Sequence, residues 1–208
     1  MLLRLITVSA CILYCTLIAW GAQAASFQKG DTLLRARAVL VQPQEDGTIR
    51  PIGGKPYISP ALIPGVDVVY FLTDYIAAEA TLGIIPHKAK VKASKMGDRD
   101  GGRIYAVAPT VLLQYHREIA EGVKPYLGMG MAYVKYFSAN APDDIHYTDD
   151  VAAIVQAGMD VKLDEKWYAN MDVKKAWVGT HAKVNGGQIN ADIDINPVVY
   201  SVGLGYKW

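Results

Sequence analysis

The last twelve residues, Pro197 to Trp208, read PVVYSVGLGYKW. From Val198 to Trp208, apolar and aromatic residues occupy alternate positions, and smaller or more polar residues lie between them. Because successive side chains of a strand point to opposite faces, this alternation predicts a β-strand with one apolar face. An unpaired apolar edge strand invites aggregation. We therefore expect this strand to pair with the first strand and close a barrel, which leaves no free edge.

The first two dozen residues differ from the rest of the chain. Arg4 gives a short basic start, Leu5 to Trp20 are almost all apolar, and Ala22-Gln23-Ala24 matches a signal-peptidase site. The apolar run is too short for a membrane-spanning helix. The pattern predicts a cleaved export signal over residues 1–24 and one domain, the barrel, over residues 25–208.

Cysteine usage and charge exclude further classes of protein. Cys11 and Cys15 are the two cysteines of the chain, and both lie in the expected signal, so we expect neither a disulfide nor thiol chemistry in the mature protein. The full chain has 21 basic and 20 acidic residues. Removing the signal removes Arg4 and leaves a net charge of zero, which argues against a nucleic-acid partner.

The alternation recurs in seven further segments. They span residues 32–41, 66–72, 76–82, 105–115, 127–133, 155–163 and 167–178. Long polar connections, expected as loops over residues 42–64, 86–103 and 138–150, alternate with short turns, and a long last hairpin turns at Asn185-Gly186. Even strand number and alternating connection length are typical of bacterial outer-membrane barrels. The sequence therefore predicts an all-β fold: an eight-stranded antiparallel transmembrane β-barrel of the outer membrane, with short periplasmic turns and long extracellular loops.

Aromatic spacing favours a barrel that faces lipid over a soluble one. Tyr105 and Tyr115 share the apolar face of one strand, and Trp167 and Trp177 share that of another. At about 3.3 Å per residue and a tilt near 40°, ten residues rise about 25 Å, the height of the apolar band between two aromatic girdles. A soluble lipocalin-like barrel with polar residues outward is the alternative.

The inward-facing residues of the strands fall into two groups along the barrel axis. Near the periplasmic turns they carry charges of both signs, which can pair across a lumen that side chains fill. We expect a charged plug of Arg35, Arg37, Glu79, Asp160, Lys162, Asp172, Lys174 and Lys207, with Gln114 and Asn170 at the same level. The outer half is small or apolar. We expect its channel lining to be Val39, Val41, Ile85, Ala108, Ala132, Val134, Ile154, Ala176 and Val178.

An apolar funnel above a charged plug suits a small hydrophobic solute better than water or ions. The plug closes the straight path to the periplasm, so sideways exit into the bilayer is the expected route. Pro109 lies in mid-strand and cannot donate a ladder hydrogen bond, so it is a candidate lateral gate. The alternative is that Pro109 is a tolerated kink, and that the charged cluster only stabilises the fold.

At several places the sequence resembles one family. The resemblance covers the whole mature chain and rests on residues 30–37, Pro86-His87, Pro109-Thr110, 112–115, 124–130, 167–172 and 196–206. These segments are similar to the outer-membrane protein W family. The resemblance implies an eight-stranded outer-membrane barrel with a hydrophobic channel for small apolar molecules, and lateral release has been proposed for the family. Some members serve as colicin receptors or respond to stress.

Two departures from the family pattern stand out. The chain ends on Trp208 rather than the usual Phe, which keeps an aromatic terminus for the barrel-assembly machinery to recognise. The last hairpin is long and contains Asn and Asp, which leaves the ligand open. The expected partners are outer-membrane lipid and lipopolysaccharide, the small hydrophobic solute, and the assembly machinery through the C-terminal strand.

Other candidate sites are weaker. His87, His116, His146 and His181 lack metal-ligand spacing, and we expect no metal and no cofactor. Asp143-Asp144 and Asp149-Asp150 are more typical of a solvated loop than of a cation site. The mature serines are Ser26, Ser59, Ser94, Ser138 and Ser201. None is expected beside a His and a carboxylate, so no catalysis is predicted. The alternative to a channel is a structural or surface-recognition barrel whose loops bind a bacteriocin, a phage or a host surface.

Overall fold

The computed structural model describes residues 27–95, 97–139, 145–184 and 189–208. The expected export signal, the turn at Asn185-Gly186 and the pair Asp143-Asp144 lie outside the described residues. Within the described ranges, no helix is long and apolar enough to cross a membrane.

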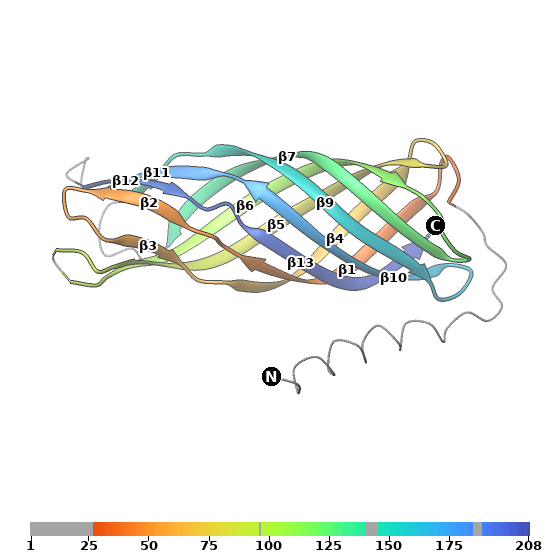
Figure 1. Cartoon of the computed structure of the whole chain (residues 1–208), viewed down its shortest axis with the longest axis horizontal. Helices are drawn as coiled ribbons and strands as arrows, with labels where there is room; N and C mark the ends of the chain where they lie inside the picture. Colours follow the sequence, from red (N-terminus) through yellow and green to blue (C-terminus); the bar gives the residue numbers. More distant parts are fainter. Residues whose placement is uncertain (1–26, 96, 140–144, 185–188) are drawn as a thin grey trace, which may run out of the picture.

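Eight strands form a closed antiparallel barrel, as the sequence predicts (Figure 1). They are β1 (Thr32–Gln42), β4 (Ala61–Phe71), β5 (Ile76–Lys92), β6 (Arg99–His116), β7 (Val123–Ala139), β9 (Asp150–Lys162), β10 (Trp167–Trp177) and β13 (Val198–Lys207). The first and last strands seal the barrel, with Ala36 opposite Leu204 and Ala38 opposite Val202. The C-terminal stretch therefore closes the sheet because it finds a partner for each of its two edges, β1 and β10.

Side chains alternate between the outside and the lumen with the predicted parity. Along β13, Val202 and Leu204 point outward and are exposed, whereas Ser201 is buried. Along β1, Leu34 is 46% exposed and its neighbour Arg35 is fully buried. A soluble protein would bury the apolar parity; here the apolar parity faces outward all round, as a lipid-facing barrel requires.

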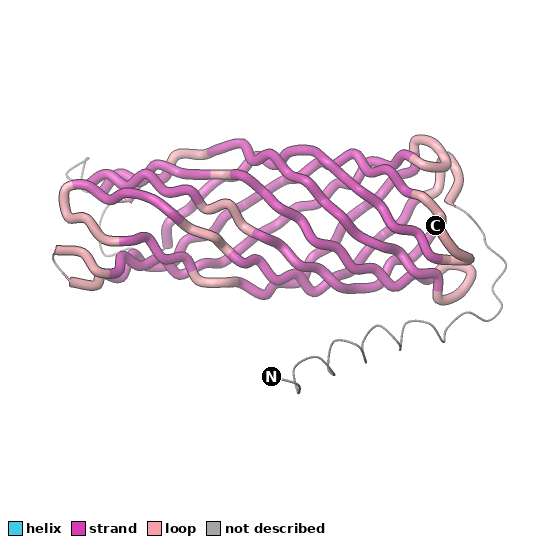
Figure 2. The backbone as a smooth tube through the Cα atoms, viewed as in Figure 1, coloured by secondary structure: helices cyan, strands magenta, loops and turns pink. Residues whose placement is uncertain are grey.

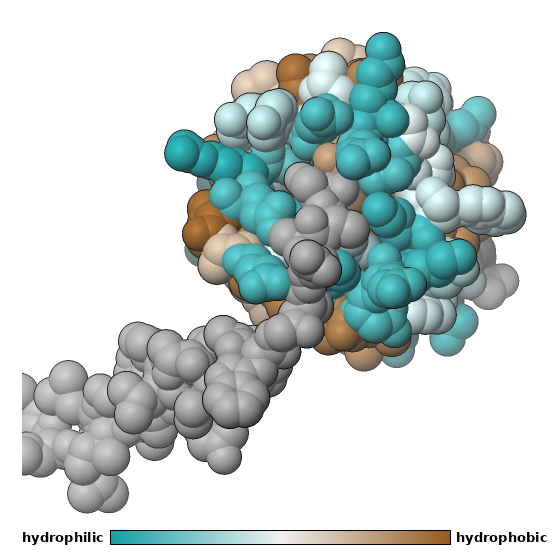
Figure 3. Space-filling model, turned by 90° about the vertical axis from the view of Figure 1, so that its right-hand side faces the viewer, coloured by the Kyte–Doolittle hydropathy of each residue, from teal (hydrophilic) through white to brown (hydrophobic). Residues whose placement is uncertain are grey.

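The outward aromatic residues gather near the two ends of this apolar wall. Tyr115 and Trp167 are exposed near the end that carries the short turns, and Phe137 and Trp177 are exposed nearer the other end. Figure 3 looks onto the end with the short turns, where hydrophilic side chains gather and hydrophobic ones lie at the margin. We call this the turn end, and the opposite end the loop end.

At the loop end, the three segments predicted as loops are largely strands, so that prediction is wrong (Figure 2). β5, β6 and β7 extend to 17, 18 and 17 residues, longer than the ten expected. The short strand β3 (Lys55–Ile58) pairs with β5. A second sheet has the order β2-β12-β11-β8, from β2 (Asp46–Arg50), β8 (Ile145–Tyr147), β11 (Gly179–Val184) and β12 (Ile189–Asp194). These strands are three to six residues long. The alternation INADID of β12 lies in the segment expected as the long last hairpin.

Candidate functional site

The lumen has three layers, and the lowest, at the turn end, is aromatic. Phe27, which precedes β1, is fully enclosed and stacks on Phe71 with ring centroids 4.4 Å apart. Tyr168 lies 4.9 Å from Phe27, and the Lys124 ammonium lies 4.1 Å from the centroid of the Phe27 ring. His116 packs on the same rings and stacks on Tyr126. We call this group the aromatic cap. Phe27 was not foreseen, because it lies outside any alternating segment.

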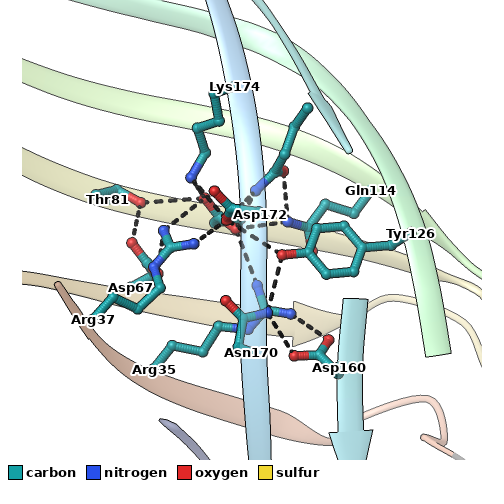
Figure 4. A network of polar contacts seen from close by, with 12 residues as sticks. Arg35, Arg37, Asp67, Thr81, Gln114, Tyr126, Asp160, Asn170, Asp172 and Lys174 are labelled. Atoms are coloured by element: carbon teal, nitrogen blue, oxygen red, sulfur yellow. Dashed lines mark hydrogen bonds and ion pairs between the residues drawn. The ribbon is translucent and has the colours of Figure 1, made fainter. Parts of the chain in front are cut away.

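The middle layer is ionic, and Arg35 of β1 is at its centre (Figure 4). The Arg35 Nη1 lies 3.1 Å from Glu79 Oε2 on β5, and its Nη2 lies 2.6 Å from Asp160 Oδ2 on β9. All three side chains are fully buried. One guanidinium thus joins three strands from different sides of the barrel, so the lumen is filled at this height.

Arg37 and Lys174 form the upper surface of the ionic layer. Arg37 pairs with Asp172 of β10, and its Nη2 lies 2.5 Å from Asp67 Oδ2 on β4. The Lys174 ammonium lies 3.1 Å from Glu79 Oε1 and 3.3 Å from Asp172 Oδ2. Each carboxylate therefore faces at least one cation, which is the condition for burying charge without a large penalty.

Neutral side chains complete the ionic layer. Three cations face four carboxylates there among the described residues, and amide and hydroxyl donors supply the remaining bonds. Gln114 donates to Glu79 at 2.6 Å, Gln156 donates to Asp172 at 2.9 Å, and Tyr126 donates to Asp172 at 3.3 Å. Gly158 makes room for this phenol, because a Cβ at that position would lie 2.4 Å from Tyr126 Cζ.

Six of the eight residues expected in the charged plug meet in this layer: Arg35, Arg37, Glu79, Asp160, Asp172 and Lys174. The other two do not. Lys207 instead pairs with Asp31 at 3.3 Å near the turn end, and Lys162 packs against Gly122 beside a turn. Both lie at the ends of their strands, below the layer. Sequence reasoning missed Asp67, Gln156 and Tyr126, although all three lie on the inward parity that had been assigned to the lumen.

Above the ionic layer the lumen is a hollow of about 660 Å³, which we call the apolar cavity. All nine residues expected to line a channel lie on its wall: Val39, Val41, Ile85, Ala108, Ala132, Val134, Ile154, Ala176 and Val178. The second sheet extends the wall with residues that the sequence did not single out. These are Ile49, Ala182, Ala191 and Ile193, with Ile52, Ile58 and Ile195 from the adjoining segments.

The cavity is hollow because its side chains are small. Five alanines face inward from β6, β7, β9 and β10 at this level: Ala106, Ala108, Ala132, Ala152 and Ala176. One layer below, the same strands present Gln114, Tyr126, Gln156, Asp160, Asn170 and Asp172. Because the backbone circumference does not change, the smaller side chains leave the centre empty. Arg37, Asp67, Thr81 and Lys174 form its polar floor.

The cavity reaches the outside of the barrel through a break in the ladder between β4 and β5. Pairing of these strands joins Asp67–Phe71 to Ala77–Thr81 and then stops. Residues 61–66 and 82–87, which the structure describes throughout, do not pair with each other. Contact returns where the Ser59 N–H donates to the Lys88 carbonyl at 3.0 Å and β3 begins to pair with β5.

We call this break the lateral window. Pro64 and Leu82 are exposed on the outside of the barrel and also contact the cavity. Gly65 and Gly83 lie on its inner side. At the lower edge the Thr81 hydroxyl donates to Asp67 Oδ1 at 2.7 Å, and at the upper edge His87 Nδ1 lies 2.6 Å from the Ser59 carbonyl. Polar bonds thus close both ends of a gap that is apolar between them.

Pro109, the expected lateral gate, lies on β6 next to the lateral window. It is exposed on β6 and is not part of the cavity wall. Val107 pairs with Lys135 and Thr110 with Ala132, whereas Ala108 and Pro109 are unpaired on the β7 side. The register is the same on both sides of this gap, so no bulge forms. On its other side Pro109 pairs with Leu82. Pro109 therefore borders the edge of the window, while the longest break is between β4 and β5.

Asp149, Asp150 and His181 line a second, polar hollow beside the second sheet. Asp149 accepts a hydrogen bond from Tyr133, and Asp150 accepts one from the Gly179 N–H. His181 pairs with Asp192 on the second sheet. Within the described ranges, no group of three or more His, Cys, Asp or Glu side chains is arranged to hold a metal ion.

Comparison with known proteins gives a consistent result. A model of the OmpW family matches residues 28–208. The outer-membrane protein y4mB of Sinorhizobium fredii is 32% identical over 182 residues, which cover 84% of this chain and 79% of that protein. The dibenzothiophene metabolism operon protein PahQ of Pseudomonas aeruginosa is 26% identical over 147 residues, which cover 68% of this chain and 69% of that protein.

Among solved structures, the outer-membrane protein OprG of Pseudomonas aeruginosa is similar to this chain with a TM-score of 0.81. The alignment covers 89% of this chain and 99% of OprG, at 24% sequence identity. At that identity the likeness shows the fold, which is the same closed barrel.

Proposed function

The chain belongs to the OmpW family of the bacterial outer membrane, and from this premise we propose that it is a narrow hydrophobic channel for passive uptake of small apolar molecules, which it releases sideways into the membrane. The observation that carries the proposal is the apolar cavity, which has an ionic floor and a lateral window. The proposal requires no catalysis, metal or cofactor. Its partners are an apolar solute, the surrounding outer-membrane lipid and lipopolysaccharide, and the assembly machinery that would recognise β13.

The cavity wall selects for apolarity. At about 25 cal/mol per Å² of apolar surface, a two-ring hydrocarbon that removes roughly 300 Å² from water gains about 7 kcal/mol. An ion gains nothing comparable, because the wall offers it no partner. The name of the relative PahQ links that protein to metabolism of dibenzothiophene, an apolar aromatic compound of this kind. This supports an aromatic or aliphatic hydrocarbon as the solute class here.

The arrangement of the ionic layer and the lateral window favours release of the solute sideways into the membrane. The fully buried pairs of Arg35 close the straight path, whereas the lateral window opens between Pro64 and Leu82 to the lipid-facing surface. Leaving the cavity for the bilayer exchanges one apolar environment for another, so no driving force beyond the concentration gradient is needed. Pro109 faces Leu82 and lacks an N–H, so we propose that it keeps this edge of the window pliant.

The central test puts a charge on the cavity wall. Ala132 is 3% exposed and faces the cavity. We expect Ala132→Arg to lower uptake of naphthalene by cells that express the protein roughly tenfold or more, because an unpaired guanidinium there holds water and costs an apolar solute at least ~1.4 kcal/mol. Ala120→Arg, at an exposed turn position, is the control. Unchanged uptake in a folded Ala132→Arg protein would rule out the channel.

A second test addresses the window. A Cβ at Gly83 would meet its nearest neighbour at 3.8 Å, so a larger side chain fits there and projects into the passage. We expect Gly83→Phe to lower uptake several-fold while Gly83→Ala leaves it near the parental level. Binding of an apolar fluorescent probe to the purified protein should persist in both, because most of the cavity is unaffected. Normal uptake by Gly83→Phe would place the exit elsewhere.

The second sheet supports one alternative, a barrel whose outer surface recognises a partner. β2 and β12 present the exposed polar side chains of Thr48, Asp192 and Asp194 on ordered strands rather than on loops. If Ala132→Arg leaves uptake intact and deletion of residues 185–188 abolishes binding of a bacteriocin or a phage, recognition is the function.

A further inference from the structure

The loop end of β3, β5 and β6 carries a group of exposed cations. They are Lys55 on β3, Lys88, Lys90 and Lys92 on β5, and Arg103 on β6, and we call them the basic face. Lys90 also contacts the apolar cavity, and the proposed channel uses none of the other four. Their position relative to the membrane and to one another points to a ligand.

Strand register places these cations on one face. Lys88 is directly opposite Arg103, and Lys92 is directly opposite Lys55. Lys88, Lys90 and Lys92 alternate with the inward-facing Ala89 and Val91. Like charges directly opposite each other on neighbouring strands destabilise the pairing. The clustering of positive charge at this place therefore lowers the stability of the strand pairing.

No carboxylate forms an ion pair with the basic face among the described residues. The acidic residues near it are Asp98, Asp100, which is opposite Lys90, and Glu45, which accepts the Ile58 N–H at 3.2 Å. Their carboxylates instead accept backbone N–H bonds, Asp98 from Ala93 at 2.9 Å and Asp100 from Gly102 at 3.0 Å. The Lys92 ammonium lies 3.7 Å from the centroid of the Tyr57 ring. The positive charge is thus available to an external anion.

The height of the basic face matches the lipid headgroups. Pro86 and Tyr105 are paired, and Lys88 and Arg103 are the next outward pair toward the loop end. Two residues rise about 7 Å along a strand. Tyr105 lies on the expected outer girdle, so the first cations stand directly above the hydrocarbon boundary. Below them Leu82 and Ile84 are 62% and 57% exposed on the same strand and offer a surface for acyl chains.

The second sheet, at the same end of the barrel, carries charges of both signs. Asp46, Asp192 and Asp194 are exposed there, and so are Arg50 and Lys183. Each of these two cations is opposite Asn190 and not opposite another cation. On the β3, β5 and β6 side, which borders the lateral window, cations stand directly opposite cations.

We propose that the basic face binds the phosphate groups of a phosphorylated glycolipid of the outer leaflet, lipopolysaccharide, with the acyl chains along Leu82 and Ile84. Phosphates at both ends of a disaccharide match a row of cations that runs from Arg103 and Lys88 to Lys92 and Lys55. Lysine and arginine are the residues that bind phosphate through charge and hydrogen bonds. This interaction does not depend on transport, and it would hold in a barrel that carried no solute.

The test measures glycolipid binding to the purified full chain in detergent, by native mass spectrometry across a concentration series. The probes are diphosphorylated lipid A, its enzymatically dephosphorylated form, and phosphatidylglycerol. The variant is Lys88→Gln with Arg103→Gln. The control is Arg50→Gln with Lys183→Gln, two exposed cations in one row of the second sheet, each paired with Asn190. Heat-modifiable migration on gels checks that each variant is folded.

We expect diphosphorylated lipid A to bind the parental chain and the control equally, and the Lys88/Arg103 variant roughly tenfold more weakly. Binding should fall as salt is raised, since exposed charges are screened. Equal weakening in variant and control would overturn the proposal, and so would equal binding of the dephosphorylated form to the parental chain. Phosphatidylglycerol binding as tight as that of lipid A would assign the face to ordinary phospholipid. If the variant does not fold, the comparison of the three lipids on the parental chain decides.

Discussion

The two halves of the lumen are built on the same eight strands and differ only in what the inward positions carry. The ionic layer places Arg35, Glu79 and Asp160 in full burial, whereas the apolar cavity places Ala132 and Ala176 at the same parity. Large polar side chains meet at the centre and close the barrel. Small apolar ones stop short of it and leave it hollow. Side-chain size and charge thus decide where one scaffold is sealed and where it is open.

The two halves should also differ in how they respond to mutation. In the ionic layer each side chain has several partners, and removing one leaves charges buried without compensation. On the cavity wall each side chain borders empty space, so its removal leaves no buried charge or polar group without a partner. The predictions below test this difference, from the largest expected effect to the smallest.

Glu79→Ala should produce the largest loss of stability. Glu79 faces Arg35 at 3.1 Å and Lys174 at 3.1 Å and accepts a hydrogen bond from Gln114. Its removal leaves two buried cations short of a partner, which costs about 3–5 kcal/mol. The guanidinium-induced unfolding midpoint of the protein in lipid vesicles measures this.

The matched control is Asp31→Asn. Asp31 pairs with Lys207 at 3.3 Å, with side chains 21% and 19% exposed. A pair that reaches water contributes about 0–1 kcal/mol. If Glu79→Ala cost no more than this control, the ionic layer would be hydrated and the barrel would not be closed there.

Ile154→Ala should cost less than a core truncation. Ile154 is buried on the cavity wall, and its removal enlarges a space that is already hollow. We expect a loss of about 1 kcal/mol in free energy of unfolding, below the roughly 2–5 kcal/mol of a packed isoleucine. Uptake of apolar solutes should persist. A loss above about 3 kcal/mol would mean that the wall is packed and the cavity is closed in solution.

Asp164→Asn, in a turn outside both layers, should have the smallest effect. Backbone N–H bonds from Lys166 and Trp167 lower the pKa of Asp164 from its ordinary value of 3.8. A carboxylate whose pKa falls on folding stabilises the protein above its unfolded pKa, and the contribution is lost as pH falls through the folded value. The difference in unfolding midpoint between parent and variant should therefore be constant at neutral pH and shrink below about pH 3.8. A difference that grows with acid would contradict this assignment.

The barrel and its inside-outside parity could be predicted because period-two alternation is a local property. Leu34 and Arg35 differ in burial as their positions in the strand require. For the same reason nine residues of the cavity wall could be assigned to the lumen from the sequence, whereas those of the second sheet could not. Asp67 was assigned to the inward parity as well, but its partner Arg37 is known only from the pairing of β4 with β1.

The lateral window could not be predicted, because it is a property of two strands together. Ile63 lies in a segment expected as a loop, and Ile85 lies beyond the expected end of its strand. No pairing between the two is predicted, so its absence cannot be seen in the sequence. Pro109 could be proposed as a gate because the missing N–H of a proline is a property of that residue alone and can be read from the sequence. The second sheet was not predicted for a related reason. β12 alternates in its own sequence, but its partner β2 lies about 145 residues away, and neither segment shows that the two pair.

The length of β5, β6 and β7 has a consequence for how a solute would reach the cavity. At about 3.3 Å per residue and a tilt of about 40°, 17 residues rise roughly 43 Å, against about 25 Å for an outer-membrane apolar band. The barrel wall therefore extends well above the acyl chains. Its upper rim is at the level of the hydrated lipopolysaccharide saccharides, which apolar compounds cross slowly. In the proposed channel, a hydrocarbon that entered at this rim would bypass the saccharide layer and cross only the hydrophobic passage beneath it.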